Sequence, residues 1–566
     1  MIGFGMRFVV ALGILVVAIA STLTGVAQRT ILAPPDFYTT TIQSTANAPY
    51  LVIPAAVIAS HPGNPTITAS AGGAVFIASG READINAFVG DSNSATVTGD
   101  LKAGFAVTNK PGSLAPVDPS GSDLWRAEAK TTLKGSLAID AEQSGAALIA
   151  SNGSSAAPAQ IKIVWAGLFD PTISNILIWT GLALMAVAAF LIILVYCQMR
   201  INRGPRRRTP KAPRPPRYRY RSIFGKPVRG RRAARFTAIV STGLTLTLLT
   251  ACAPSKPVTA SSAHPSSTAQ VQPVTLLDSQ VKRILGEVAG VATDADTSLN
   301  KDALTERFAG AALQVRLTNY QLRKLNSRIA GMPKIVASPI QFSIPAAAQV
   351  WPRTWMAVTD EKGDTNLPQM LVLQQDTPRS NYKVWFTIRL MPGAKIPATP
   401  PSDKGAIMVD PASLFLKVSP NKLPAIFGEV LNLGQSSVKA PLFDLNNQFY
   451  AQVSGAQQAQ IVQLKKANIK FSHTLGDPNV ISLATSDGGA LVAVYQSDID
   501  TIKPTKAGSA VKVGAEEKLL LGSNGSSLGV KSVYGDMLLF YVPAVDDAGQ
   551  ITLIGATQGL ISVSTL

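Results

Sequence analysis

The sequence has little of the chemistry that most enzymes and metalloproteins use. Its two cysteines, Cys197 and Cys252, are too few for a disulfide framework. Its three histidines, His61, His264 and His473, lie far apart in the sequence, so a multi-histidine metal site is not expected. We predict no catalytic, cofactor-binding or metal-binding residues, no cofactor, and a protein that is not an enzyme.

Motifs of nucleophilic and phosphate chemistry are also missing. No Gly-x-Ser-x-Gly elbow occurs, and the glycines of LGSNGSSLG (521–529) are not followed by Lys-Ser or Lys-Thr. Paired carboxylates can hydrolyse glycosides, but nothing in the sequence orients such a pair. We interpret the available acids as solvated loop residues: Asp498, Asp500, Glu516, Glu517, Asp546 and Asp547.

Charged residues make up only 15% of the chain, whereas soluble globular proteins carry about 25%. The net charge of +18 comes mostly from one block, residues 200–235, which holds 15 Lys or Arg and no Asp or Glu. The rest of the chain carries only +3. The basicity is therefore local and is not a property of the folded domains.

Two long apolar runs predict helices that cross a membrane. Residues 8–27 provide 20 largely apolar positions, a length that matches a hydrocarbon core of about 30 Å. A cleavable signal peptide ending at Gly25-Val26-Ala27 is the alternative for this segment, which we bound as residues 1–28. Residues 171–199 contain no charged residue, so we assign them to a transmembrane helix.

The positive charges orient these two segments. Residues 29–170 contain 8 basic and 11 acidic residues, whereas the block at 200–235 directly follows the second apolar run. Because positive residues near a span favour the cytoplasmic side, we place residues 29–170 outside and the block inside.

The basic block itself predicts binding to anionic lipid headgroups. Each Lys or Arg near an anionic leaflet contributes about 1 kcal/mol. The alternating Arg217-Tyr218-Arg219-Tyr220-Arg221 resembles some nucleic-acid tails, but its position beside membrane segments favours lipid, and we expect no nucleic acid partner. The residues selected for membrane-surface binding are Arg206, Arg207, Arg208, Arg231, Arg232 and Arg235.

A third apolar segment, residues 236–254, leaves two interpretations open. It ends in Leu249-Thr250-Ala251-Cys252 behind a basic stretch, which is the pattern of a bacterial lipoprotein signal. The chain is then cut before Cys252 and the thiol is lipidated; otherwise the segment is a third span. Both interpretations place the following residues outside, where 255–275, rich in Pro, Ser and Thr, are predicted to form a disordered tether.

The exported segments differ in pattern. Residues 29–170 show short β-rich runs between Gly, Asn, Pro and Ser clusters, which predicts a β-sandwich. From residue 276, helical periodicity precedes strand-like runs, and this order occurs twice. We predict two α+β domains with helices on an antiparallel sheet, at 276–401 and 402–566. Asn300 is the expected N-cap of a helix and Asp487-Gly488-Gly489 an expected hairpin turn.

One aromatic and basic motif marks the first of these α+β domains. In the segment VWPRTW, the side chains of Trp351, Arg353 and Trp355 would share one face of a strand. Such a face suits core or edge packing, or the stacking of a sugar. These three residues therefore form the candidate ligand surface.

The C-terminal half resembles an uncharacterised family of actinobacterial lipoproteins and membrane proteins. The likeness lies in DALTERFAGAAL (302–313), FSIPAAAQVWPRTWMAVT (342–359) and ISLATSDGGALVAVY (481–495). It implies paired, cone-like α+β domains similar to the nuclear-transport-factor-2-like or cystatin-like folds, which can enclose a pocket. It implies no particular ligand or activity, and we recognise no relative of the N-terminal half.

Together these patterns predict a multi-pass cell-membrane protein with most of its mass extracytoplasmic. We expect a non-enzymatic scaffold or accessory subunit in envelope or surface-polymer assembly, with other envelope proteins as partners. A lipoprotein that binds a small molecule or glycan is the alternative, and an extracytoplasmic hydrolase is the weaker one. A pocket with convergent polar groups would favour the ligand binder, an exposed apolar patch the scaffold, and a buried carboxylate pair in a cleft the hydrolase.

Overall fold

The computed structural model describes residues 2–33, 35–141, 145–167, 171–201, 276–348, 350–360, 367–402, 404–476 and 480–566. The third apolar segment, the predicted tether and the basic block beyond Ile201 lie outside these residues. The chain divides into two compact units. One contains helices α1 and α4, and the other contains all the remaining elements.

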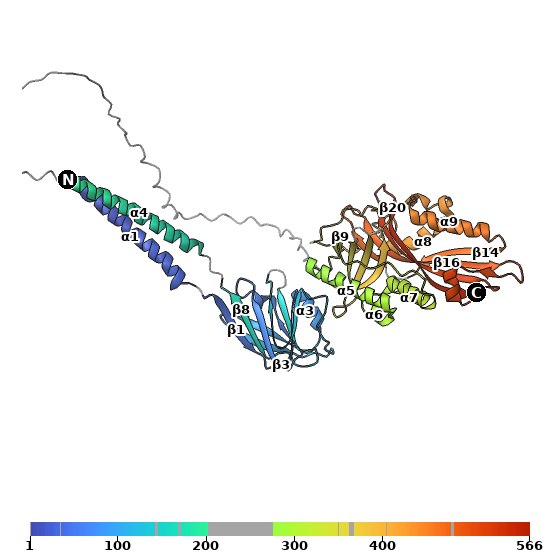
Figure 1. The fold of residues 1–566 in the computed structure, drawn as a ribbon, viewed down its shortest axis with the longest axis horizontal. Helices are drawn as coiled ribbons and strands as arrows, with labels where there is room; N and C mark the ends of the chain where they lie inside the picture. Colours follow the sequence, from blue (N-terminus) through green and yellow to red (C-terminus); the bar gives the residue numbers. More distant parts are fainter. Residues whose placement is uncertain are drawn as a thin grey trace, which may run out of the picture. The chain divides into compact units, whose positions relative to one another are not determined.

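Helices α1 (Ile2–Thr30) and α4 (Thr172–Ile201) are long and apolar enough to cross a membrane, as the sequence predicts (Figure 1). They pack antiparallel and closely: a Cβ on Gly25 would meet Ile178, and one on Gly181 would meet Thr22. Small residues at such contacts let helix backbones approach each other. The buried positions recur every seven residues, at Ala11, Ala18 and Gly25 on α1 and at Ser174, Gly181, Ala188 and Val195 on α4.

Residues 35–167, here called the β domain, contain eight strands. They are β1 (Phe37–Gln43), β2 (Tyr50–Ile53), β3 (Thr66–Gly80), β4 (Ser94–Asp100), β5 (Gly104–Lys110), β6 (Ala127–Ala138), β7 (Ala146–Ala150) and β8 (Gln160–Ala166). The predicted sandwich of two sheets is corrected, because the strands form one sheet in the order β1-β8-β3-β7-β2-β4-β5, with β6 also on β3. The long strand β3 connects the two halves of this sheet, because its first part, Thr66–Ser70, pairs with β8 and its last part, Phe76–Gly80, pairs with β7.

Two short helices, α2 (Ala55–Ile58) and α3 (Glu82–Val89), interrupt these strands. The sequence predicts β-rich runs throughout residues 29–170, and this is wrong for the segment GREADINAFVGD (80–91), which contains α3. Ile85, Phe88 and Val89 lie at helical spacing and are buried in a cluster with Trp125. The helix is too short for its periodicity to stand out in the sequence.

Residues 276–566, here called the C-terminal domain, begin with helices and a four-stranded meander. The elements are α5 (Asp278–Ser298), α6 (Lys301–Thr305), α7 (Gly310–Leu325), β9 (Ile340–Pro345), β10 (Arg353–Thr359), β11 (Gln369–Gln375) and β12 (Lys383–Arg389). The predicted helices and strands of this segment are confirmed. So is the cap, because the side chain of Asn300 accepts hydrogen bonds from the backbone amides of Asp302 and Ala303.

A second group of helices and strands follows. Its elements are α8 (Leu423–Leu433), β13 (Phe443–Asp444), α9 (Gln448–Gln463), β14 (Ala467–Leu475), β15 (Ile481–Ala484), β16 (Ala490–Pro504), β17 (Val511–Lys512), α10 (Ala515–Leu521), β18 (Gly525–Ser526), β19 (Val530–Val542) and β20 (Ile551–Thr565). The main sheet has the order β13-β20-β19-β16-β14, with β15 on β16. The predicted turn at 487–489 joins β15 to β16, and Gly488 there has a positive φ of 85°.

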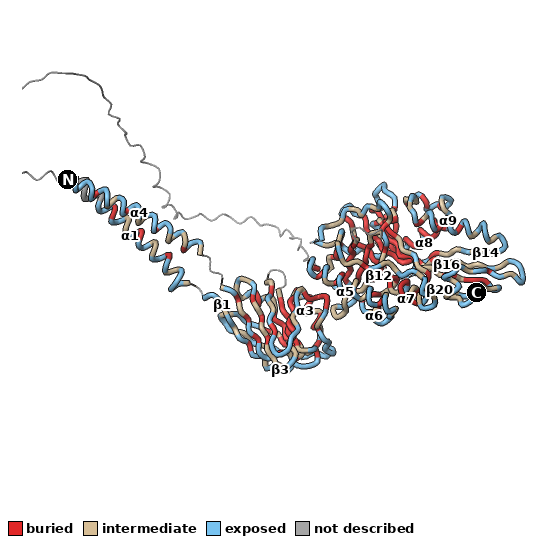
Figure 2. Tube along the Cα trace, in the orientation of Figure 1, coloured by how far each residue is buried: buried red, intermediate tan, exposed pale blue. Residues whose placement is uncertain are grey.

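The two sheets of the C-terminal domain share a hydrophobic core. One buried cluster contains Trp355 and Leu371 from the first sheet and Leu491 and Leu539 from the second. A further cluster lies on the other face of the second sheet, beneath α8. Figure 2 shows buried positions concentrated along these strands and those of the β domain. The predicted boundary at residue 401 therefore separates two sheets that pack against each other.

Candidate functional site

Polar residues that are buried or half-buried gather on one face of the second sheet, and we call them the acid cluster: the buried His473, Gln496, Asp498 and Asp536, and the half-buried Asp500. Along β16, alternate residues are apolar from Ala490 to Val494 and then become Gln496, Asp498 and Asp500. Strand pairing completes the cluster, because His473 on β14 lies opposite Asp498, and Asp536 on β19 lies opposite Gln496.

Each nitrogen of the His473 imidazole has two polar neighbours. Its Nε2 lies 3.0 Å from Oδ1 of Asn432 on α8 and 3.3 Å from Nε2 of Gln457. Its Nδ1 lies 3.3 Å from Nε2 of Gln496 and 3.3 Å from Oδ1 of Asp498. Burial lowers the pKa of His473 to about 4, which favours the neutral imidazole.

The aspartates of the acid cluster retain protons far above the usual range. Burial, followed by the charges of Asp536 and Asp500, raises the pKa of Asp498 to about 8. Burial raises the pKa of Asp536 to about 7 and that of Asp500 to about 6. A carboxylic acid offers the O–H donor that a carboxylate lacks, and the buried acceptor oxygens Oε1 of Gln496 and Oδ1 of Asp536 have no donor within the described residues.

The structure corrects the interpretation of Asp498 and Asp500 as solvated loop residues. Both lie on β16, and Asp498 is 5% exposed. Glu516 and Glu517 lie on helix α10 and not in a loop; Glu516 is exposed, whereas Glu517 is half-buried and accepts hydrogen bonds from the hydroxyls of Ser532 and Tyr534. The exposed Asp546 and Asp547 fit the earlier interpretation. Within the part of the chain that the structure describes, no group of three or more His, Cys, Asp or Glu side chains is arranged to hold a metal ion. The chemistry available to the acid cluster is therefore the uptake and release of protons near neutral pH.

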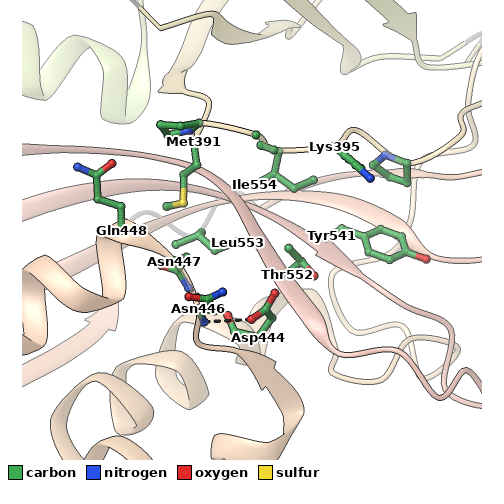
Figure 3. Close-up of a pocket in the computed structure, with 14 residues that line it drawn as sticks. Met391, Lys395, Asp444, Asn446, Asn447, Gln448, Tyr541, Thr552, Leu553 and Ile554 are labelled. Carbon is green, nitrogen blue, oxygen red and sulfur yellow. Dashed lines mark hydrogen bonds between the residues drawn. The ribbon is translucent and has the colours of Figure 1, made fainter.

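A pocket of about 540 Å³ lies elsewhere in the C-terminal domain (Figure 3). Polar side chains from the start of α9 and from the strands β19 and β20 meet apolar ones from the loop after β12. The lining includes Met391, Lys395, Asp444, Asn446, Asn447, Gln448, Tyr541, Thr552, Leu553 and Ile554. The sequence did not reveal this pocket, because its Asp-Leu-Asn-Asn segment (444–447) also has the composition of a helix start, and Asn447 does cap α9.

The candidate ligand surface lies where the C-terminal domain meets the β domain. Trp355 is fully buried and its indole donates to the hydroxyl of Ser343. The guanidinium of Arg353 lies 3.7 Å from the ring centroid of Trp351 and donates to the carboxylate of Asp84 at 2.7 Å. Trp351 packs against the buried cluster of the β domain. All three side chains are therefore in contact with protein: Trp355 with the C-terminal domain, and Arg353 and Trp351 with the β domain.

The other residues singled out in the sequence lie outside the described part of the chain. They are the lipidation candidate Cys252 and the membrane-surface residues Arg206, Arg207, Arg208, Arg231, Arg232 and Arg235. Their roles remain predictions from the sequence.

Comparison with known proteins places the C-terminal domain in a family. No curated protein and no solved structure matches the chain. The predicted likeness to nuclear-transport-factor-2-like folds therefore stays a prediction. A family model described as a domain of unknown function (DUF8094) matches residues 274–565, which is just over half of the chain. The chain belongs to this DUF8094 family.

Proposed function

We propose that this protein is a membrane-anchored extracytoplasmic scaffold, or an accessory subunit, in the assembly of the cell envelope or a surface polymer. The observation that carries the proposal is the close antiparallel pair of α1 and α4. The β domain lies between these two helices in the sequence, with α1 ending at Thr30 and α4 beginning at Thr172. A domain that lies between two transmembrane helices in the sequence is anchored to the membrane at both of its ends.

The packing of α1 also favours a retained anchor over a cleaved signal peptide. Gly25 belongs to the proposed cleavage site, yet in the structure it lies against α4, with the backbone oxygen of Ser174 2.9 Å from the position of a Cβ. A segment removed after export would not need this fit. We therefore propose a multi-pass protein with residues 29–170 and 253–566 outside the cytoplasm.

Part of the buried charge supports a scaffold. Among the described residues of the β domain, Asp84 and Asp123 are buried carboxylates that pair with arginines of the C-terminal domain, and Asp84 also pairs with Arg81 of its own domain. Carboxylates paired in this way are not free to act on a substrate. The buried carboxylates of the acid cluster keep a hydrolase as the weaker alternative.

Topology is tested by cysteine labelling in intact cells. In a background without cysteine, Cys197→Ser with Cys252→Ser, the exposed residues Lys102 and Lys512 are replaced singly by cysteine and treated with a membrane-impermeant maleimide. We expect both to be labelled before lysis. Protection of either one until lysis would refute the proposed orientation.

The pocket in Figure 3 supports the second candidate, a ligand-binding protein, because its volume and mixture of polar and apolar groups suit a small molecule or glycan. Native mass spectrometry of protein purified from its own membrane would show a co-purifying ligand in the parent chain. That ligand should be lost in Thr552→Trp, which fills the pocket, and kept in Ser562→Trp, a control on an exposed site of the same strand.

Complementation separates the two functions. Thr552→Trp and Arg379→Ala are introduced separately into a strain that lacks the gene, and the integrity of the envelope is measured as resistance to lysozyme. Arg379 of the C-terminal domain donates hydrogen bonds to the carbonyls of Phe88 and Val89 in the β domain. We expect the scaffold to require this contact between the domains, so Thr552→Trp should restore resistance and Arg379→Ala should not. The reverse result would replace the scaffold proposal with ligand binding.

A further inference from the structure

We propose that the β domain and the C-terminal domain form a complementary binding pair that stays together when the chain between them is cut. Lipoprotein processing before Cys252 would then yield a two-chain complex and not two separate proteins. The inference depends on the contacts between the two domains and not on the scaffold role. It also names the partner of a DUF8094 domain: a β domain with two buried aspartates.

Asp123 of the β domain has its hydrogen-bond partners in the C-terminal domain. Its carboxylate accepts hydrogen bonds from the guanidinium of Arg307 and, at 2.7 Å, from the backbone amide of Tyr382. Its backbone N–H donates to Oδ1 of Asn381 at 3.1 Å, and its carbonyl accepts from Nε2 of Gln280 at 3.0 Å. Every polar group of this fully buried residue therefore bonds to the C-terminal domain.

Arg379 makes a second, independent set of contacts at the end of α3. The last carbonyls of a helix lack partners within it, and a cation is favourable there. The guanidinium of Arg379 donates to the carbonyls of Phe88 at 2.8 Å and Val89 at 3.0 Å. It also donates to the carbonyl of Ala115 and the hydroxyl of Ser92. An arginine of the C-terminal domain thus caps a helix of the β domain.

The two surfaces are complementary in charge. The C-terminal domain contributes Arg283, Arg307, Arg353 and Arg379, of which the first two also pair with Glu287 of the same domain. The β domain contributes a helix C-terminus, Asp123, and Asp84, which also pairs with Arg81. Trp351 adds an apolar contact with the buried cluster of the β domain. Desolvated charge pairs and an aromatic anchor are the features that make specific protein–protein contacts tight.

The test uses the full chain with a protease site inserted into the 255–275 segment and a tag at the C-terminus. Membranes are opened by sonication, treated with the protease so that the chain is cut at the inserted site, and then sedimented in 0.15 M salt. Because the cut lies after Cys252, the tagged fragment carries neither the lipid nor, among its described residues, a helix apolar enough to cross a membrane. Its contact with the β domain is expected to hold it in the pellet, and the variants at this contact distinguish that from retention by other membrane proteins.

We expect the tagged fragment to sediment with the membranes in the parent and in Arg328→Ala, an exposed arginine used as the matched control. Arg379→Ala removes four hydrogen bonds and should raise the released fraction by on the order of tenfold or more. Asn381→Ala, a milder change, should release an intermediate amount. Complete release from the parent, or equal retention of all four proteins, would overturn the proposal.

Discussion

Arg307 of the C-terminal domain holds both carboxylate oxygens of Asp123 in the β domain. Its Nη1 lies 2.6 Å from Oδ2, and its Nη2 lies 3.2 Å from Oδ1. The side chain of Asp123 is fully buried and that of Arg307 is 6% exposed. A two-pronged pair of this kind fixes direction as well as distance, and it makes each partner depend on the other.

Replacing Arg307 alone should therefore be costly. Arg307→Met leaves Asp123 buried with less compensation, and we expect a loss of about 3 kcal/mol in the free energy of unfolding, measured by urea titration of the full chain in detergent at pH 7.5. Asp123→Asn in the same chain removes the buried charge, which then keeps Arg283 and the backbone amide of Tyr382 as partners, and should restore part of the loss. A loss of under about 1 kcal/mol in the single variant would show that the pair contributes no more than a surface ion pair.

The close packing of α1 on α4 can be tested through its glycines. A Cβ on Gly181 would lie 2.2 Å from the hydroxyl of Thr22, whereas one on Gly13 would meet nothing within 4 Å. We expect Gly181→Leu to separate the helices and Gly13→Leu to leave them together.

Disulfide formation reports this separation. Because the hydroxyl of Ser21 donates to the carbonyl of Leu177 at 2.9 Å, cysteines at these two positions should cross-link on oxidation in a background without other cysteines, Cys197→Ser with Cys252→Ser. The loss of free thiols is read by mass spectrometry. Equal cross-linking in both leucine variants would contradict the close contact, and failure of the parent to cross-link would point to removal of α1.

The lipoprotein interpretation of the third apolar segment makes a prediction of its own. If the chain is processed before Cys252, cells fed a clickable fatty acid should contain a labelled C-terminal species of about half the full mass, and Cys252→Ala should abolish it. A single unlabelled band of full length would make the segment an ordinary span. In that case the domain pairing would still hold, but within one chain.

Local pattern was enough to predict most elements of the C-terminal domain. Apolar residues at helical spacing marked α5, Asn300 marked the start of α6, and runs of β-branched and aromatic residues marked β9 to β12. Each of these signals lies within a few residues of the element it describes. The local pattern did not predict helix α3, because its eight residues form barely two turns, too few for a clear helical periodicity.

Long-range pairing is what the sequence could not reveal. Asp123 and Arg307 are separated by 184 positions, and nothing near either residue indicates the other. The acid cluster depends on register, since His473 faces Asp498 only because β14 and β16 pair as they do. A shift of one residue would turn each of these side chains to the opposite face.

The raised pKa values of the acid cluster lead to a prediction about stability and pH. Burial raises the pKa of Asp498 from 3.8 to about 8, so between these values the folded chain holds a proton that the unfolded chain has released. The contribution of such a group to stability is fully present below the lower value and is lost as the pH rises through the upper one. His473 acts in the opposite direction, because its pKa falls from 6.5 to about 4, and its contribution is lost as the pH falls through that range.

Above pH 6.5 the unfolded histidine loses the rest of its proton and the acids dominate the response of the acid cluster. Each proton that the folded chain holds and the unfolded chain has released changes the free energy of unfolding by about 1.4 kcal/mol per pH unit. We therefore expect the unfolding temperature of the parent to fall between pH 6.5 and 9. Asp498→Asn keeps the shape of the side chain but cannot ionise, so it should flatten this fall and be more stable than the parent at pH 9. Asp546→Asn, an exposed acid, is the matched control and should follow the parent. If Asp498→Asn keeps the slope of the parent, Asp498 is ionised in the folded protein and the acid cluster does not store a proton at that position.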